Sequence, residues 1–89
     1  MRAENLKHII KEKTIIRLSE SLSFVYRKVE EKALEGFERI EIECHEIFPE
    51  FENDFFTLDK HIMLLLDMLN DRGFDAYISV DGVCIGWEL

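Results

Sequence analysis

Carboxylates are the most concentrated chemical groups in this chain, and they gather between Phe37 and Asp59. This stretch, FERIEIECHEIFPEFENDFFTLD, holds eight acidic side chains against one basic side chain, Arg39. On an extended strand, carboxylates two residues apart lie about 6.6 to 6.8 Å from each other, close to the spacing of successive phosphates along a nucleic-acid strand. The pattern therefore favours a surface that imitates a phosphate backbone. A solvated sheet face explains the same acids equally well.

The acids expected to contact a partner come from a predicted strand and the loop that follows it. Alternation over the predicted strand 37–47 turns Ile40, Ile42 and Cys44 toward a core and turns Glu41 and Glu43 outward. Glu38 and Glu46 have the parity of the inward face, so they join the row only where the strand frays or twists at its ends. The candidate partner-binding residues are Glu38, Glu41, Glu43, Glu46, Glu50, Glu52 and Asp54.

Other groups with catalytic or metal-binding chemistry are present but are not spaced for it. Cys44, His45 and Glu46 are adjacent in the predicted strand and therefore alternate between its two faces. His61 and Cys84 stand apart from them, and the sequence has neither C-x-x-C nor H-x-x-x-H spacing. It also lacks a glycine-rich phosphate loop. We expect no catalytic residues, no metal and no cofactor, and a protein that is not an enzyme.

The net charge of −8 is divided unevenly along the chain. Residues 1–34 hold eight Lys/Arg and five Glu, a net charge of +3, whereas residues 35–89 hold three Lys/Arg and fourteen Asp/Glu, a net charge of −11. A surface this acidic repels nucleic acid and anionic membranes. The expected partner is therefore a basic protein, for instance a nucleoid or other DNA-binding protein, and neither nucleic acid nor membrane is expected to bind directly.

Apolar spacing predicts a long first helix from Ala3 to Glu35, ended by Gly36. Its apolar stripe is interrupted at Lys13, which predicts a break where Thr14 caps a restarted helix. At about 1.5 Å per residue the helix is too long for a small sheet, so residues 1–13 are expected to project. Pairing with a second copy would cover them, and a frayed terminus is the alternative. The expected homodimer interface is Leu6, Ile9, Ile10, Ile15, Leu18 and Leu22.

Four phenylalanines lie in the nine residues from 48 to 56, more than a solvated loop carries. Phe55 and Phe56 are expected in the core, and Phe48 and Phe51 at an interface. The helix that follows is predicted to begin with Thr57 as its N-cap and to end at Gly73. Its expected inward stripe is Leu58, Ile62, Leu65 and Leu69.

Residues 74–89 have the pattern of a β-hairpin. Asp81-Gly82 is the preferred sequence of a two-residue type I′ turn, and alternating apolar residues flank it on both sides. This turn fixes the register of the two strands. The pairs that it predicts are Val80–Val83, Ile78–Ile85, Ala76–Trp87 and Phe74–Leu89.

These elements predict one α+β domain over residues 1–89, with helices on one face of a three-stranded sheet. A right-handed crossover makes the first two strands parallel. The last strand has Glu88 as its only charge, and its placement in the middle leaves the first strand as an acidic edge. No apolar run approaches the ~20 residues of a membrane span, and the start lacks a secretory signal pattern. We therefore expect a cytoplasmic protein.

The stretch LNDRGFDAYISVDGVCIGWEL resembles a recurrent ending of small bacteriophage early proteins: a helix closed by glycine and an aromatic residue, a strand, a tight turn and a last strand with Ile-x-Trp, here Ile85-Gly86-Trp87. Small acidic phage proteins of the host-takeover kind include DNA mimics that block a basic host protein such as the nucleoid protein HU. The resemblance implies a non-enzymatic inhibitor in the host cytoplasm. It carries over no site residue, because DNA mimics share charge placement and no motif. The alternative is a phage assembly homo-oligomer whose acids only keep it in solution.

Overall fold

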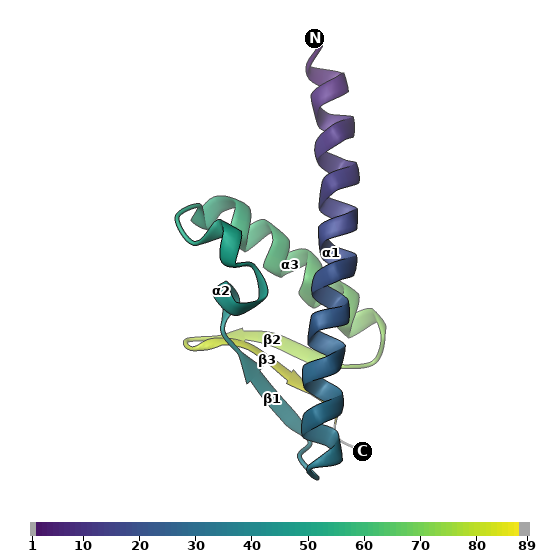
Figure 1. Ribbon diagram of the computed structural model, residues 1–89, viewed down its shortest axis with the longest axis vertical. Coiled ribbons are helices and arrows are strands. Elements are labelled where there is room, and N and C mark those ends of the chain that lie inside the picture. Colours follow the sequence, from purple (N-terminus) through teal and green to yellow (C-terminus); the bar gives the residue numbers. More distant parts are fainter. Residues whose placement is uncertain (1, 88–89) are drawn as a thin grey trace.

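The computed structural model describes residues 2–87 and has the predicted α+β arrangement (Figure 1). In chain order its elements are helix α1 (Ala3–Leu34), strand β1 (Arg39–Ile42), the short helix α2 (Cys44–Ile47), the 3-10 helix η1 (Pro49–Phe51), helix α3 (Phe55–Asp71), and strands β2 (Asp75–Ser79) and β3 (Gly82–Gly86). Helix α1 packs against β1 and α3, and α3 packs against β2. The two long helices thus cover one face of the sheet, as the sequence predicts.

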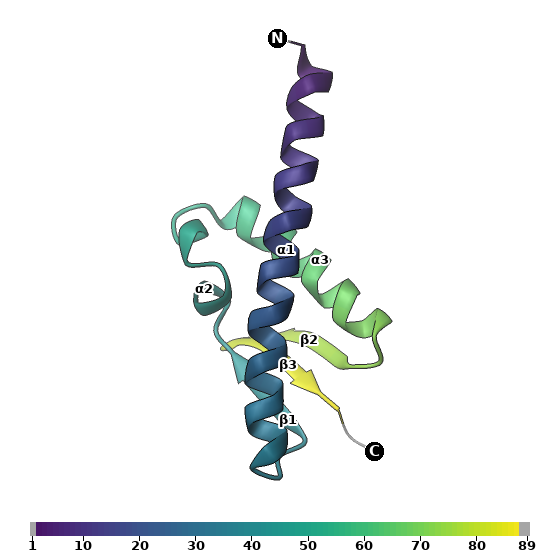
Figure 2. The same ribbon diagram turned by 45° about the vertical axis from the view of Figure 1, so that its right-hand side comes forward.

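Helix α1 is a single unbroken helix of 32 residues. The predicted break near Thr14 is therefore wrong. The apolar side of the helix changes between Ile16, which is exposed, and Leu18, which is buried. The first buried residue of α1 is Leu18, and the helix before it extends away from the sheet (Figures 1 and 2). We call residues 3–16 the arm and residues 18–87 the body. The arm lies along the longest dimension of a molecule that measures 52 × 25 × 17 Å.

Both long helices end at the glycines predicted from the sequence. Gly36 has φ +94° and Gly73 has φ +91°, a backbone conformation that is unfavourable for residues with a Cβ atom. The amide of Phe37 donates to the carbonyl of Lys32 at 3.0 Å, and that of Phe74 donates to Leu69 at 3.1 Å. Each glycine thereby closes its helix in a Schellman motif.

The sheet has the strand order β1-β3-β2, and β3 is antiparallel to both neighbours. The last strand therefore lies in the middle, β1 and β2 run in the same direction, and both predictions are confirmed. The inner face of the sheet supplies Ile42, Val83, Ile85 and Ala76 to the core beneath the helices.

The first strand is shorter than predicted. It ends at Ile42, and Glu43 is the N-cap residue of α2, so a strand from 37 to 47 is wrong. The turn into α2 buries the side chains of Ile47 and Phe48, which are 3% and 0% exposed. Strand alternation over this stretch would have turned one of these two adjacent residues to solvent. Burial of both apolar side chains favours the turn.

The register of the hairpin differs from the prediction by two residues. Ser79 pairs with Gly82, Ala76 pairs with Ile85, and residues 80 and 81 form the turn. Neither turn residue has positive φ, which a type I′ turn requires. Gly82 has another role, because a Cβ there would overlap the carbonyl oxygen of Ile42 on β1. The predicted pair Phe74–Leu89 lies outside the described residues.

The phenylalanine assignments are reversed in the structure. Phe48 is in the core and Phe51 packs against it, whereas Phe55 and Phe56 are 71% and 86% exposed in the first turn of α3. The N-cap of α3 is Asp54 and not Thr57. The carboxylate of Asp54 accepts a hydrogen bond at 3.1 Å from the backbone amide of Thr57, three residues later, as an N-cap side chain does. The predicted inward stripe of Leu58, Ile62, Leu65 and Leu69 is buried.

Candidate functional site

The seven acids predicted to contact a partner are distributed over several elements. The strand that was expected to carry a row supplies only Glu41, while Glu43 precedes α2, Glu46 lies within it and Glu50 lies in η1. Glu38, Glu52 and Asp54 lie in the connecting segments. The structure therefore does not bring these acids together on one strand.

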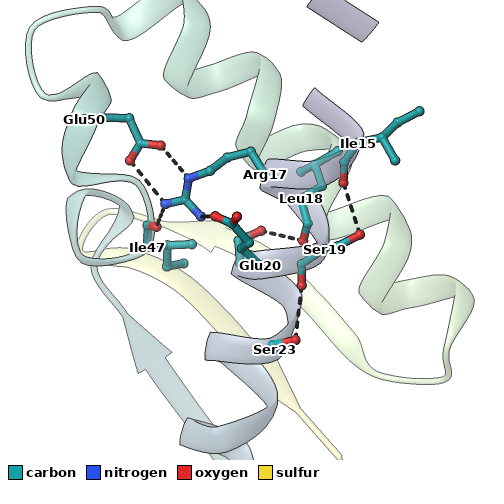
Figure 3. Close-up of polar contacts among 9 residues, drawn as sticks. Ile15, Arg17, Leu18, Ser19, Glu20, Ser23, Ile47 and Glu50 are labelled. Carbon is teal, nitrogen blue, oxygen red and sulfur yellow. Dashed lines mark hydrogen bonds and ion pairs between the residues drawn. The ribbon is translucent and has the colours of Figure 1, made fainter. Parts of the chain in front are cut away.

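Glu50 is held by Arg17, the residue at which the arm meets the body (Figure 3). Nε of Arg17 and Nη2 of Arg17 donate to the two carboxylate oxygens of Glu50, the second at 3.1 Å. Nη2 also donates to the carbonyl oxygen of Ile47 at 2.7 Å, and the guanidinium lies 4.9 Å from the ring centre of Phe48. This fork geometry is that of a bidentate charge-assisted pair. Arg17 thus ties α1 to the segment that connects α2 and η1.

The pair changes the titration of both groups. The hydrogen bond from Arg17 lowers the pKa of the Glu50 carboxyl below its ordinary value of 4.5, and burial opposes this only in part. The same hydrogen bond raises the pKa of Arg17, which stays a cation. Glu50 is therefore an anion that is already paired with Arg17 of its own chain. It would attract a basic partner less strongly than a carboxylate without such a pair.

Four of the predicted acids have partners of their own. Besides Glu50, Glu43 lies 2.9 Å from Nε2 of His45, Glu46 lies 3.9 Å from Nζ of Lys28, and Asp54 accepts two hydrogen bonds from Thr57. Those hydrogen bonds lower the pKa of Asp54. The remaining three, Glu38, Glu41 and Glu52, form no ion pair with another residue between positions 2 and 87.

A cleft of about 580 Å³ lies on the outer face of the sheet, the face that the helices leave open. The backbone of Gly86 forms its floor, since it stands between Arg39 on β1 and Asp75 on β2. The next row across the sheet is Glu41, Cys84 and Tyr77, and Trp87 closes one end. Of these residues, the sequence predicts only Glu41 as a partner-binding residue. The predicted register placed Tyr77 opposite Gly86, so the actual neighbours across the sheet were missed. We call this site the sheet cleft.

The Glu41 carboxylate is hydrogen-bonded to two other side chains in the sheet cleft, which the charged residues Arg39 and Asp75 also line. It accepts a hydrogen bond from the thiol of Cys84 at 3.2 Å and one from the hydroxyl of Ser79 at 3.4 Å. Tyr77 is nearly half exposed beside it. A carboxylate next to an aromatic ring is an arrangement that attracts a cationic side chain.

The arm carries a second candidate surface. Its five large aliphatic side chains are each between 45% and 57% exposed, although such residues are usually buried. Four of the six predicted interface residues belong to this set. The exposed set is Leu6, Ile9, Ile10, Ile15 and Ile16.

The other two predicted interface residues, Leu18 and Leu22, are buried in the core of their own chain and are therefore not accessible to a second copy. Ile16 was left out of the predicted interface, although it is as exposed as Ile15. A helical wheel would have identified it, because Ile16 lies seven residues after Ile9 and so on the same side of the helix.

A groove of about 470 Å³ lies where the arm joins the body. One wall is α1 between Ile9 and Glu20, and the other is formed by Glu50, Phe51 and His61. We call it the shoulder groove. It is continuous with the exposed aliphatic side chains of the arm, because Ile9, Ile10 and Ile16 belong to both.

His61 is buried within the body, and Cys44 is partly buried. Nδ1–H of the buried His61 donates to the carbonyl of Thr57 at 2.9 Å, and its ring packs 4.6 Å from that of Phe51. Burial raises the pKa of the Cys44 thiol, which disfavours the thiolate form of a nucleophile. Among residues 2–87, no three His, Cys, Asp or Glu side chains are grouped so that they could hold a metal ion.

No helix between residues 2 and 87 combines the length and the apolar character needed to cross a membrane. Comparison of the chain with protein-family models, curated proteins and solved structures gave no match. The fold and the two candidate surfaces are therefore the basis for a functional proposal.

Proposed function

We propose that the protein is a non-enzymatic binding protein that works as a homodimer, with the arm as its assembly surface. The observation that carries this proposal is the set of five exposed aliphatic side chains on the part of α1 that precedes its first buried residue, Leu18. A helical segment without tertiary contacts gains little stability in water. Burial of apolar surface contributes about 25 cal/mol per Å², and a second copy offers a surface of the same character.

The mass in solution tests the proposal. We expect the wild-type chain to have twice the mass of one chain, and Leu6→Glu/Ile9→Glu to have the mass of a monomer, in sedimentation equilibrium over a range of concentrations. The matched control is Phe56→Glu/Val80→Glu, which places the same two charges on exposed apolar residues of the body. A wild-type monomer, or a variant that keeps the wild-type mass, would contradict the proposal.

The sheet cleft favours a second function on the same molecule, the capture of a basic DNA-binding protein in place of its nucleic acid. Glu41 supports it, because its carboxylate has no ion pair among the described residues and lies in a cleft that Tyr77 and Trp87 also line. A lysine or arginine from the partner would form an ion pair with the carboxylate and a cation-π contact with an aromatic ring at the same site. The resemblance of the C-terminal hairpin to phage early proteins is compatible with this function. Dimerisation would present the sheet cleft twice, so the two functions support each other.

Displacement of DNA from a basic protein tests the second function. The probe is HU bound to a fluorescent duplex, with anisotropy measured at about 50 mM and about 200 mM salt. We expect this protein to displace the duplex at low salt, and Glu41→Lys to need about tenfold more protein for half displacement. Asp67→Lys makes the same charge change on the exposed side of α3 and is the control. Equal effects of the two variants would exclude the sheet cleft as the binding site.

A further inference from the structure

A regular seam runs along the exposed side of α1. Six residues recur at alternating intervals of four and three positions, which is the spacing of the contact positions in a coiled coil. All six are exposed. Thr14 and Arg17, which do not belong to this set, are partly buried. They lie on the opposite side of the helix from Leu18 and Leu22, which face the core. The seam consists of Arg2, Leu6, Ile9, Lys13, Ile16 and Glu20.

The seam is complementary to a second copy of itself that runs in the opposite direction. We infer that two copies pair antiparallel along it, centred near residue 11, an inference that rests on the proposed homodimer. A two-fold axis at that point makes every contact occur twice. The contacts are Arg2 with the partner's Glu20, Leu6 with the partner's Ile16, and Ile9 with the partner's Lys13.

The charges at the ends of the seam select this direction over the parallel one. Parallel pairing in register would place Arg2, Lys13 and Glu20 each against its own copy, which makes three like-charge contacts. Antiparallel pairing replaces the two at the ends by ion pairs. It also places the aliphatic stem of Lys13 over Ile9 while the ammonium group reaches solvent.

The charge of the whole molecule selects the same direction. Residues 1–17 hold five Lys/Arg and two Glu, a net charge of +3, and residues 18–89 hold six Lys/Arg and seventeen Asp/Glu, a net charge of −11. Parallel arms would place two strongly acidic bodies side by side, within the range over which charges interact at physiological salt. Antiparallel arms place the bodies at opposite ends and lay the basic arm of each chain toward the acidic body of the other.

The seam also forms part of the shoulder groove. Four of its residues, Ile9, Lys13, Ile16 and Glu20, line that groove, whose other wall is Glu50, Phe51 and His61. The seam faces away from Leu18 and Leu22 in the core, so the partner helix lies along the groove and beside these body residues. The partner's first turn lies at the end of the groove formed by Arg17 and Glu20.

Disulfide trapping distinguishes the two directions. In a Cys44→Ser/Cys84→Ser background, chains with Leu6→Cys are mixed with affinity-tagged chains with Ile16→Cys and oxidised. Antiparallel pairing brings these two positions together and predicts a mixed disulfide. It holds two copies of position 6 about 15 Å apart along the helix, beyond the reach of a disulfide, so Leu6→Cys alone forms none. In the control mixture Leu34→Cys, at the exposed far end of α1, replaces Ile16→Cys and forms no mixed disulfide.

The outcomes separate this inference from the proposed function. A dimer in which Leu6→Cys links to itself, or in which neither disulfide forms, overturns the antiparallel seam and leaves the homodimer intact. A wild-type monomer refutes both.

Charge exchange gives a second test that leaves both native cysteines in place. Arg2→Glu and Glu20→Arg are each expected to weaken dimerisation by about tenfold. The double variant restores the wild-type dissociation constant only if the two positions face each other across the dimer. Failure of the double variant to recover would overturn the inference.

Discussion

Arg17 is expected to be the most important single polar residue for the stability of this fold. Four interactions meet at its guanidinium: the bidentate pair with Glu50, the hydrogen bond to the Ile47 carbonyl at 2.7 Å, the contact with the Phe48 ring at 4.9 Å, and a longer ion pair with Glu20 at 3.9 Å. Its side chain is 24% exposed and that of Glu50 is 41% exposed, so solvent screens the pair in part.

The expected cost of removing it follows from these contacts. An exposed ion pair contributes about 0.5 to 1 kcal/mol, a hydrogen bond from a charged donor about 1.5 kcal/mol, and the cation-π contact about 0.5 kcal/mol. These values are not strictly additive, and we expect Arg17→Met to lower the free energy of unfolding by about 2 kcal/mol. Methionine keeps the aliphatic packing of the stem, so the loss reports the guanidinium.

Urea unfolding followed by circular dichroism measures this change. The experiment uses the Leu6→Glu/Ile9→Glu background at one protein concentration, because dimerisation would otherwise contribute to the measured stability. The midpoint should fall by roughly 1 to 2 M urea. Lys28→Met is the control on the same helix, since Lys28 has only a 3.9 Å contact with Glu46 and a 5.7 Å contact with the Phe24 ring.

Lys28→Met should cost under about 0.5 kcal/mol. If Arg17→Met costs no more than this control, the Arg17 contacts do not stabilise the body, and the inference that Arg17 ties α1 to the segment connecting α2 and η1 is wrong. Glu50→Gln in the same series isolates the carboxylate, with an expected loss of about 0.5 to 1 kcal/mol.

Three further changes test other parts of the structure by urea unfolding. Gly82→Ala should cost about 3 kcal/mol or more, because a Cβ there overlaps the β1 backbone. Gly36 has φ +94° and free space for a Cβ, so Gly36→Ala should cost about 1 kcal/mol; equal costs would argue against the close approach of β1 to Gly82. Phe48→Ala should cost about 3 to 5 kcal/mol and Phe56→Ala at most about 0.5 kcal/mol, and the reverse order would contradict the observed core. Because the folded pKa of Glu50 lies below the unfolded one, its contribution is complete above the ordinary pKa of 4.5 and is lost as the pH falls through the folded pKa. Glu50→Gln should flatten this acid limb, and an unchanged limb would argue against the lowered pKa.

Local signals in the sequence were sufficient for the long helices and for the strand order. The glycines that end α1 and α3 act through their own backbone conformation, and each needs only its neighbours to do so. The stripe of α3 follows from helical periodicity alone. Placing β3 in the middle follows from its lack of charge, because a central strand is covered on both edges.

Tertiary contacts decided the parts that were predicted wrongly. The four phenylalanines between positions 48 and 56 have the same hydrophobicity, and only the turn into α2 determines that Phe48 is buried and Phe56 is not. Asp81-Gly82 strongly favours a local turn. The chain nevertheless places Gly82 within the strand, because β1 passes so close that only glycine fits. Neither contact is visible without the distant segment.

The candidate site shows the same limit. The sequence identified the acids but not their partners, since Arg17 and Glu50 are 33 residues apart along the chain. The interruption at Lys13 was interpreted as a break in the helix. In the structure the helix continues past Lys13. The large aliphatic residues up to Ile16 are exposed, whereas Leu18 and Leu22 face the core.

The unbroken course of α1 has a mechanical consequence. No hinge separates the part of the helix that is rooted beneath the sheet from the part that extends away, so a pair of chains joined through their extensions would be a stiff rod with one sheet cleft toward each end. Leu18 of the two chains would be separated along the rod by about 21 Å. Such a rod fixes the distance between the two sheet clefts in advance. A target with two basic sites at that distance would bind both sheet clefts at once.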